Sequence, residues 1–342
     1  MNSERLVRGN PMNGSSRIGG AWKGLLPVGV AAGIALVIGG GVDVVHNRQR
    51  AVKTEHAAKP AAKSEQTTSR FVVGVRDVGT ALLVRDVRGA EVGLPVGAPR
   101  GTRFRHVSAV KNRSFIVSAS SPRQVTFQRL KLNAAGRPTT LQSLPKATLS
   151  GVSTAYSDQA VSPDGDRIAY VTYRGAASRV DVVSARTGIR KSWTTMVPAH
   201  VNSLSWAGDT LAFVWSPLRH VNGKMIEVRH QVRTLDTRLP SGDLKVSKAV
   251  LHLPKGATKA VLTRDSRTVI AGLAQNAQVT LQAFAADTGK PTRVVARQRT
   301  MARVSRLDPD HTGRHLLLAL TDGRLYMDGT VLYTPDLTDA AW

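Results

Sequence analysis

The stretch that decides the fold is AVSPDGDRIAYV, residues 160–171. Pro163-Asp164-Gly165 has the chemistry of a tight turn, because Pro presets φ, Asp hydrogen-bonds its own backbone and Gly tolerates positive φ. The run that follows, from Ile168 onward, is apolar on both faces, which predicts a buried strand. Weaker copies of this turn and strand recur along the chain. A series of such units is typical of a β-propeller.

Six short apolar runs recur after residue 70, with starts separated by 43 to 58 residues. A propeller blade of four short strands takes about 40–50 residues, so each interval holds one blade and its loops. Three hairpins with Gly-containing turns supply the outer half of a blade, at residues 83–94, 180–193 and 280–294. The six runs are Phe71–Val75, Ser114–Ser118, Arg167–Val171, Thr210–Val214, Thr268–Gly272 and His315–Ala319.

The two ends of this repetitive region complement each other. Phe71 opens what resembles the second strand of a blade, with no first strand ahead of it. Leu337–Trp342 resembles Val201–Trp206, the first strand of another blade. We therefore expect the C-terminal strand to pair into the first blade, which closes the ring and removes exposed sheet edges. The predicted fold over residues 71–342 is an all-β, six-bladed β-propeller, with seven blades as the alternative.

Residues Ser162–Tyr170, together with the SARTG and ADTG hairpins at residues 184–188 and 286–289, resemble the repeats of the Tol–Pal periplasmic propeller. They are similar also to WD-repeat-like bacterial propellers. The similarity covers most of residues 71–342 as a pattern, and only the blade around Ala160–Trp193 matches closely. The resemblance implies an extracytoplasmic or scaffolding module of six to eight blades that binds other proteins. Some propellers of this kind are fused to peptidases, but we expect no hydrolase domain here.

An uncharged stretch of 18 residues, Leu25–Val42, precedes the repeats. At 1.5 Å per residue it extends roughly 27 Å, close to the thickness of a bilayer core. Trp22 and Lys23 stand where an aromatic and cationic interface anchor is expected. We predict a single transmembrane helix at residues 25–45, acting as an uncleaved signal-anchor.

The flanks of this helix predict the topology. Residues 1–24 form a polar tail and residues 46–70 a flexible linker, both too poor in large apolar groups to fold. Counting positive charges does not decide the orientation, but a short basic tail ahead of a signal-anchor favours a cytoplasmic N-terminus. The propeller would then lie outside the cell membrane. Gly29 and Gly33 could pack two such helices together, yet this spacing arises easily by chance in a Gly- and Ala-rich helix, so we expect a monomer.

The chain is strongly basic and contains no cysteine, with 48 Lys and Arg against 23 Asp and Glu. Residues 71–342 hold 38 basic and 19 acidic side chains, a net charge of +19. Such a field attracts anionic partners. The charges are dispersed rather than clustered, which argues against a nucleic-acid-binding surface and is also consistent with ordinary surface decoration. The absence of cysteine excludes disulfides and thiolate metal sites.

Motifs for catalysis are missing from the sequence. No Gly-x-Ser-x-Gly elbow, no His-Glu-x-x-His zinc motif and no glycine-rich phosphate loop occur. His311 and His315 are four residues apart but flank a turn, where that spacing gives no shared face. The aspartates in turns are explained by capping of their own backbone. We therefore predict no enzyme activity, no cofactor and no metal.

Two groups of residues are candidates for recognition. The first lies on predicted inner strands around the mouth of the central channel, and the second on a long hairpin, Val214–Val228, whose Asn222-Gly223 is a strong hairpin-turn signal. The competing explanation for the first group is that these are ordinary solvated polar side chains around a wide channel. For the second group it is that the hairpin is an insertion without a function. The channel candidates are Asp158, His200, Lys259, Arg303 and Asp339, and the hairpin candidates are Trp215, Arg219, His220 and Lys224.

The sequence thus favours a membrane-anchored, extracytoplasmic binding or scaffold protein of the bacterial envelope. The expected partner is an envelope protein or an anionic cell-wall polymer. Two alternatives remain open at this point: a transmembrane sensor that signals through its short N-terminal tail, and an accessory domain of an envelope hydrolase.

Overall fold

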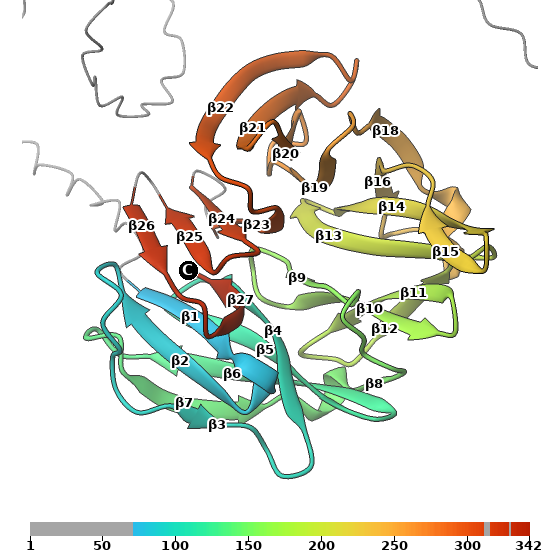
Figure 1. Cartoon of the computed structure of the whole chain (residues 1–342). Helices are drawn as coiled ribbons and strands as arrows, with labels where there is room; N and C mark the ends of the chain where they lie inside the picture. Colours follow the sequence, from blue (N-terminus) through green and yellow to red (C-terminus); the bar gives the residue numbers. More distant parts are fainter. Residues whose placement is uncertain (1–70, 311–314, 328–329) are drawn as a thin grey trace, which may run out of the picture. The chain divides into compact units, whose positions relative to one another are not determined.

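Six β-sheets surround a central axis in the computed structural model, which describes residues 71–310, 315–327 and 330–342 (Figure 1). The first strands of neighbouring blades contact each other from blade 1 to blade 6, and an ion pair between Arg306 and Asp339 joins the first strands of blades 6 and 1. From inner to outer strand, blade 1 is β27 (Leu337–Ala341), β1 (Phe71–Arg76), β2 (Ala81–Asp86) and β3 (Val96–Gly97). Blade 2 is β4 (Arg103–Val110), β5 (Ser114–Ser121), β6 (Gln124–Leu132) and β7 (Pro138–Ser143), with β8 (Leu149–Ser150) beside β6. Blade 3 is β9 (Gln159–Val161), β10 (Arg167–Arg174), β11 (Ala177–Ser184) and β12 (Arg190–Thr194), with β17 (Gly242–Asp243) beside β12.

The second half of the ring repeats the same order. Blade 4 is β13 (Ala199–Ala207), β14 (Thr210–Val221), β16 (Gln231–Asp236) and β18 (Lys248–His252), with β15 (Lys224–Glu227) beside β14; blade 5 is β19 (Ala257–Leu262), β20 (Thr268–Gln275), β21 (Gln278–Ala285) and β22 (Pro291–Arg299); blade 6 is β23 (Val304–Pro309), β24 (Leu316–Leu320), β25 (Arg324–Met327) and β26 (Thr330–Tyr333). In the described part of the chain the helical elements are three short 3-10 turns: η1 (Asp77–Gly79), η2 (Pro145–Ala147) and η3 (Leu244–Val246).

The predicted six-bladed propeller is therefore confirmed, and the alternative of seven blades is wrong. All six predicted runs are second strands of blades, namely β1, β5, β10, β14, β20 and β24. One outer strand differs from the prediction. Residues 91–94 pair with β2 only through a bridge between Arg85 and Glu91, and β3 begins later. Gly93, at φ +79, and Pro95, which has no N–H, interrupt the ladder there.

The Pro163-Asp164-Gly165 turn folds as its residues dictate. The N–H of Gly165, at φ +75, donates to the carbonyl of Ser162 at 2.8 Å, and the Asp164 carboxylate accepts from the N–H of Asp166 at 3.1 Å. Blade 5 uses the same device, since the N–H of Arg267 donates to the Asp265 carboxylate at 2.9 Å. These aspartates thus cap their own turns, as predicted.

The C-terminal strand closes the ring. β27 pairs antiparallel with β1, placing Ala341 opposite Val73 and Asp339 opposite Val75. Trp342 is 4% exposed and packs between blades 6 and 1. The predicted closure is confirmed, and it places the carboxylate of Asp339 at the axis of the molecule.

The core consists of six apolar clusters, one between each pair of neighbouring blades. The cluster between blades 3 and 4 contains Trp193, Trp206 and Phe213, and the one between blades 1 and 2 contains Phe104 and Phe115. The remaining four join blades 2 and 3, 4 and 5, 5 and 6, and 6 and 1. Because each sheet buries both faces against its neighbours, its middle strands are apolar on both sides.

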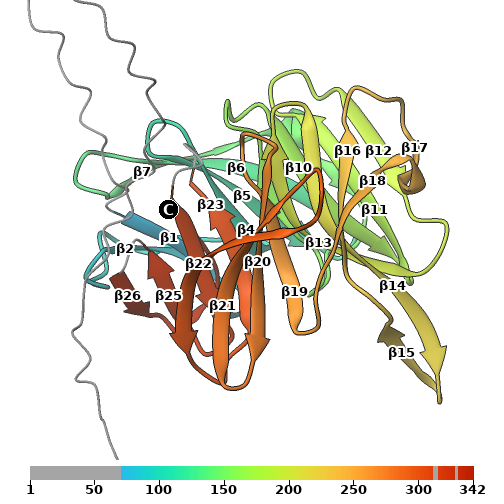
Figure 2. The ribbon, with the colours of Figure 1, turned by 90° about the horizontal axis from the view of Figure 1, so that it is seen from above.

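The hairpin of β14 and β15 extends beyond the neighbouring blades (Figure 2). Its turn residues Asn222 and Gly223 have φ of +48 and +77, as the Asn-Gly pair predicts. Pro217, where the hairpin begins, pairs with Ala199 at the start of the inner strand β13. The hairpin therefore rises from the face of the propeller on which the inner strands begin.

The predicted tail, transmembrane helix 25–45 and linker 46–70 lie outside the described residues. Over the residues that are described, no helix has the length and apolar character needed to cross a membrane.

Candidate functional site

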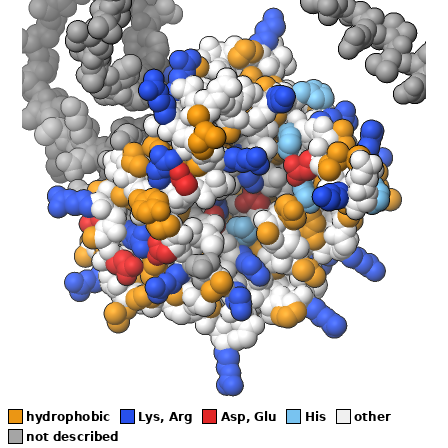
Figure 3. Space-filling view, in the orientation of Figure 1, with side chains coloured by type: hydrophobic (Ala, Val, Ile, Leu, Met, Phe, Trp, Pro, Cys, Tyr) orange, Lys and Arg blue, Asp and Glu red, His pale blue; other side chains and the backbone are white. Residues whose placement is uncertain are grey.

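A cavity of about 250 Å³ lies at the axis, and every inner strand contributes to its lining. Figure 3 shows acidic and histidine side chains within the hollow near the middle of the face drawn there. The loop before β9 adds Ser157 and Asp158. The contributions of the inner strands, in chain order, include His106, Gln159, Ser203, Lys259, Arg306 and Asp339.

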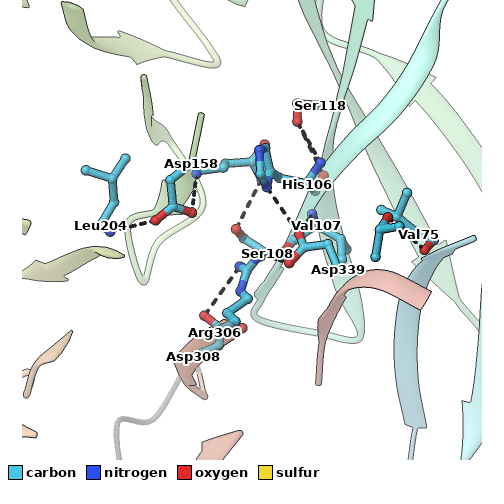
Figure 4. Close-up of polar contacts among 12 residues, drawn as sticks. Val75, His106, Val107, Ser108, Ser118, Asp158, Leu204, Arg306, Asp308 and Asp339 are labelled. Atoms are coloured by element: carbon cyan, nitrogen blue, oxygen red, sulfur yellow. Dashed lines mark hydrogen bonds and ion pairs between the residues drawn. The ribbon is translucent and has the colours of Figure 1, made fainter. Parts of the chain in front are cut away.

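Arg306 is the centre of an ion-pair network in this cavity (Figure 4). Its guanidinium contacts the Asp339 carboxylate, lies 3.7 Å from Oδ1 of Asp308, and donates to the carbonyl of Val107 at 2.9 Å. Burial alone would lower the pKa of Arg306, but the carboxylates of Asp339 and Asp308 outweigh it and raise that pKa. The arginine therefore stays charged and holds blade 6 to blades 1 and 2.

The pKa values of the two carboxylates beside Arg306 are shifted in opposite directions. Burial raises the pKa of Asp308 to about 6, because the attraction of Arg306 offsets only part of the desolvation and the negative charge of Asp339 adds to it. Burial also acts on Asp339, but the charge of Arg306 and the hydrogen bonds from His106 and the Val107 N–H hold the pKa of Asp339 below its ordinary value. Asp339 is thus the ionised member of the pair, and Asp308 is the one poised to take up a proton.

Side-chain oxygens on three inner strands, or just before them, accept hydrogen bonds from the backbone of the next blade. Asp339 accepts from the N–H of Val107 at 2.8 Å, and Asp158 from the N–H of Leu204 at 3.0 Å. The hydroxyl of Ser205 accepts from the N–H of Leu262 at 3.0 Å. Two of the residues predicted for recognition, Asp158 and Asp339, therefore also connect neighbouring blades through hydrogen bonds.

Lys259 lines the same cavity but has a different environment. Among the described residues, no carboxylate or hydrogen-bond acceptor lies within bonding distance of its ammonium group. Burial lowers the pKa of Lys259, and the more distant charge of Asp158 only partly opposes the effect. Within the described lining of the cavity, Lys259 is thus the charged side chain without a hydrogen-bond or ion-pair partner.

The channel prediction is met in part. Asp158, Lys259 and Asp339 all line the cavity. Arg303 does not: its side chain is exposed outside the lining. The arginine at the axis is Arg306, which lies within β23, whereas Arg303 precedes that strand.

Sequence reasoning missed His106, Arg306 and Asp308. The signal for the last two was present, since Arg306 and Asp308 alternate with buried Leu307 on an inner strand and must share the opposite face. His106 carried no comparable signal. It faces Asp339, with Nδ1 3.5 Å from Oδ2, only because the closing strand is its neighbour.

His200, the remaining channel candidate, does not line the cavity. It lies near the start of β13, at the rim of the propeller face, and contacts the hairpin instead. Its Nδ1 lies 2.7 Å from Oε1 of Glu227, whose Oε2 lies 2.7 Å from Nε2 of His230. Tyr156 stacks on the His200 ring at 3.8 Å between centroids. The hydrogen bond with His230, and then that with His200, hold the pKa of Glu227 at about 2 against the effect of burial. Glu227 therefore stays ionised and ties the base of the hairpin to the rim.

The hairpin displays alternating faces. Arg219 pairs with Ile226, and Val221 with Lys224, so cations and aliphatic groups share one face. His220 pairs with Met225 on the face that carries Glu227. Arg219, His220 and Lys224 are exposed as predicted, and so are four aliphatic or thioether side chains, those of Val221, Met225, Ile226 and Val228.

Trp215 corrects the prediction for the hairpin. Only 8% of it is exposed, and it belongs to the core between blades 3 and 4, with the Arg233 guanidinium 4.4 Å from its ring centroid. Strand β14 is continuous through this residue, and Trp215 precedes the part that leaves the body of the blade. A surface aromatic contact is therefore not available at this position.

No cluster of three or more His, Asp or Glu side chains within the described ranges is arranged to hold a metal ion. His311 lies outside these residues, so the predicted absence of a site with His315 stays a prediction.

Comparisons with known proteins find structural similarity at low sequence identity. No family model matches the chain, and no curated protein matches it. Among solved structures, the chain is similar to TolB from Acinetobacter baumannii, with 12% identity, a TM-score of 0.48, and coverage of 80% of this chain and 65% of that one. It thus spans less than two thirds of that TolB.

Two further structures are similar over nearly their whole length. A functionally unknown protein from Desulfotomaculum acetoxidans DSM 771 has 12% identity and a TM-score of 0.49, with 80% of this chain and 98% of that one covered. A protein of unknown function from Bacteroides caccae has 10% identity and a TM-score of 0.47, with the same coverages. The propeller architecture itself is given by the six sheets of this chain.

Proposed function

We propose that this protein is a membrane-anchored binding protein whose propeller recognises an acidic protein partner outside the cytoplasmic membrane. The recognition surface is the face on which the inner strands begin, with the hairpin of β14 and β15 as its main contact. This hairpin is the observation that carries the proposal. It leaves the body of the blade, exposes apolar side chains to solvent, and is tied to the channel rim through Glu227.

The composition of the hairpin favours a protein partner over a cell-wall polymer. Val221 and Ile226 share a face with Arg219 and Lys224, so the surface offers apolar area and positive charge together. Protein interfaces bury such mixed patches, with aliphatic groups desolvated and arginine at the edge. A uniform polyanion would need the cations alone.

Membrane attachment belongs to the same proposal. It rests on the uncharged stretch Leu25–Val42 and its flanking Trp22 and Lys23. A linker of about 25 residues would give the propeller freedom to reach a partner in the envelope. Added protease should then digest the propeller in intact spheroplasts, and protection of the propeller until the membrane is lysed would contradict this topology.

Binding is tested by crosslinking and capture with the full chain. In one variant His220–Met225 is replaced by Asn-Gly, which keeps Arg219 opposite Ile226 and only shortens the hairpin. A partner crosslinked to the wild-type protein should be lost with this variant. Capture of the same protein by the shortened hairpin would overturn the proposal.

Two double variants separate charge from apolar contact. Arg219→Glu with Lys224→Glu should abolish capture, whereas Arg293→Glu with Arg297→Glu, a matched reversal of exposed charges on β22, should leave it unchanged. Val221→Ser with Ile226→Ser should weaken a protein contact by tenfold or more. Binding of a wall polymer that ignores the serine variant but disappears in high salt would instead identify the polymer as the partner.

A further inference from the structure

The ammonium group of Lys259 faces a cavity to which all six inner strands contribute, and it lacks a partner among the described residues. We infer that this cavity is a binding site for a single carboxylate group, held by Lys259. The site lies on the axis, inside the ring, and is separate from the surface contact of the hairpin.

The other charges of the cavity are already engaged. The two oxygens of Asp158 accept from the N–H groups of Gln159, at 2.7 Å, and Leu204, at 3.0 Å. Arg306 is held by Asp339 and the carbonyl of Val107 and lies 3.7 Å from Asp308. His106 lies 3.5 Å from Asp339. A ligand carboxylate would therefore find one available cation, while Asp158 and Asp339 are occupied by the donors that join the blades.

An unpaired cation in such a place is costly. The Lys259 side chain is half-buried, so its ammonium loses part of its hydration, which an opposite charge or hydrogen bonds would recover. Burial lowers the pKa of Lys259, consistent with an ammonium that lacks a near anion. A carboxylate that enters the channel would supply that anion and would raise the pKa of Lys259 toward its ordinary value.

The remaining lining suits a small organic acid or one carboxylate-bearing side chain. A volume of about 250 Å³ is slightly below the roughly 300–1,000 Å³ of drug-sized ligand sites. Ala155, Leu204, Leu307 and Leu320 provide apolar wall for a short carbon skeleton. Ser203, at φ +55 in the bulge of β13, adds a hydroxyl to the lining. A non-glycine residue at positive φ is a strained arrangement of the kind that recurs at ligand sites.

The carboxylate has two possible sources. It is either a free small acid or the acidic side chain or C-terminus of the partner that the hairpin binds. The second source rests on the proposed function, because the partner must reach over the rim at His200 into the channel. The first source does not depend on it.

The experiment is a nuclear magnetic resonance titration of the full chain labelled with ¹³C at the lysine ε-carbon. The probes are acetate, succinate, and a short peptide with a free or an amidated C-terminus, with acetamide as the neutral analogue of acetate. The Lys259 signal, assigned by its loss in Lys259→Met, should shift saturably with the carboxylates. Lysine signals from exposed positions such as Lys255 should not shift.

Succinate binding measured by isothermal titration calorimetry should weaken at least tenfold in Lys259→Met and stay unchanged in Lys255→Met. Equal binding of acetamide and acetate, or unchanged binding of succinate by Lys259→Met, would overturn the inference. Thermal unfolding checks that the methionine variant is folded.

The hairpin variant separates the two proposals. Succinate should bind to the shortened hairpin as it binds to the wild type, so failure to find a protein partner leaves the carboxylate site standing. Conversely, hairpin-dependent capture of a partner without any carboxylate-induced shift of Lys259 would overturn the site and leave the proposed function intact. A free peptide C-terminus that binds at least tenfold more tightly than acetate identifies the partner as the source.

Discussion

The carboxylate of Asp339 accepts a hydrogen bond at 2.8 Å from the backbone N–H of Val107, a residue 232 positions earlier in the chain. The same carboxylate contacts the guanidinium of Arg306, which in turn donates to the carbonyl of Val107. Blades 6, 1 and 2 are therefore joined at the axis through one side chain of the closing strand. The ring is closed at its centre as well as along the ladder of β27 and β1.

Replacing Asp339 by Asn should destabilise the propeller by about 3–5 kcal/mol, because it leaves the buried charge of Arg306 without its main partner. Urea denaturation at pH 7 measures the change. Asp287→Asn, in an exposed turn of blade 5, is the matched control and should shift the free energy of unfolding by less than about 0.5 kcal/mol. Equal stability of the two variants would show that the axial network contributes nothing.

Deleting residues 337–342 should cost more than about 4 kcal/mol or prevent folding, because it exposes both the edge of β1 and the cluster that contains Trp342. The shortened hairpin with Asn-Gly in place of His220–Met225 also removes residues but leaves every blade complete, so it should unfold like the wild type. Circular dichroism during thermal unfolding compares the two. A truncated chain that melts at the wild-type temperature would mean that β27 does not hold the ring closed.

Asp308 should make stability fall as pH rises through about 6. Its pKa is raised in the folded state to about 6, from 3.8, so the folded protein holds a proton that the unfolded chain has released. This contribution is fully present below the unfolded pKa and is lost as pH rises through the folded one. Asp308→Asn removes the proton linkage, and the difference between variant and wild type should change by about 2 kcal/mol between pH 4 and pH 7.5. If the free energies of unfolding of the two proteins, measured in urea, changed with pH in parallel, the raised pKa of Asp308 would be contradicted.

Glu227 should hold the hairpin on the rim. Its pKa of about 2 means that its contribution is present above the ordinary pKa of a glutamate and is lost only as pH falls toward 2. Glu227→Gln removes the charged acceptor at neutral pH, so trypsin should cut at Arg219 or Lys224 several-fold faster. Glu91→Gln, which removes a longer contact with Arg85 at 3.5 Å, should leave that cleavage rate unchanged. Unchanged cleavage in Glu227→Gln would show that the His200–Glu227–His230 contacts do not restrain the hairpin.

Much of the fold could be predicted because its determinants are local. The Pro163-Asp164-Gly165 turn and the Asn222-Gly223 turn depend on φ values that these residues favour whatever surrounds them. The order of strands within each blade follows from consecutive hairpins. Even the closure was readable, because one blade lacked an inner strand and the last residues resembled one.

The candidate site was less predictable because it depends on contacts between blades. Arg303 was expected at the axis, but it precedes β23, and the arginine that lines the cavity is Arg306 within that strand. The residue at which a strand begins depends on its pairing with the neighbouring strand, which residue type alone does not reveal. Trp215 looked like a surface aromatic, yet the continuation of β14 beyond it leaves it in the core. His106 meets Asp339 only because the ring closes.

The sequence by itself determined the turns, the strands, their repetition and the closing strand, since these follow from backbone preferences and from alternation of apolar residues over a few positions. Only the tertiary structure decided which charged side chains meet at the axis and which one lacks a partner. Their contacts join residues far apart in the chain, and their protonation depends on burial that no single strand provides.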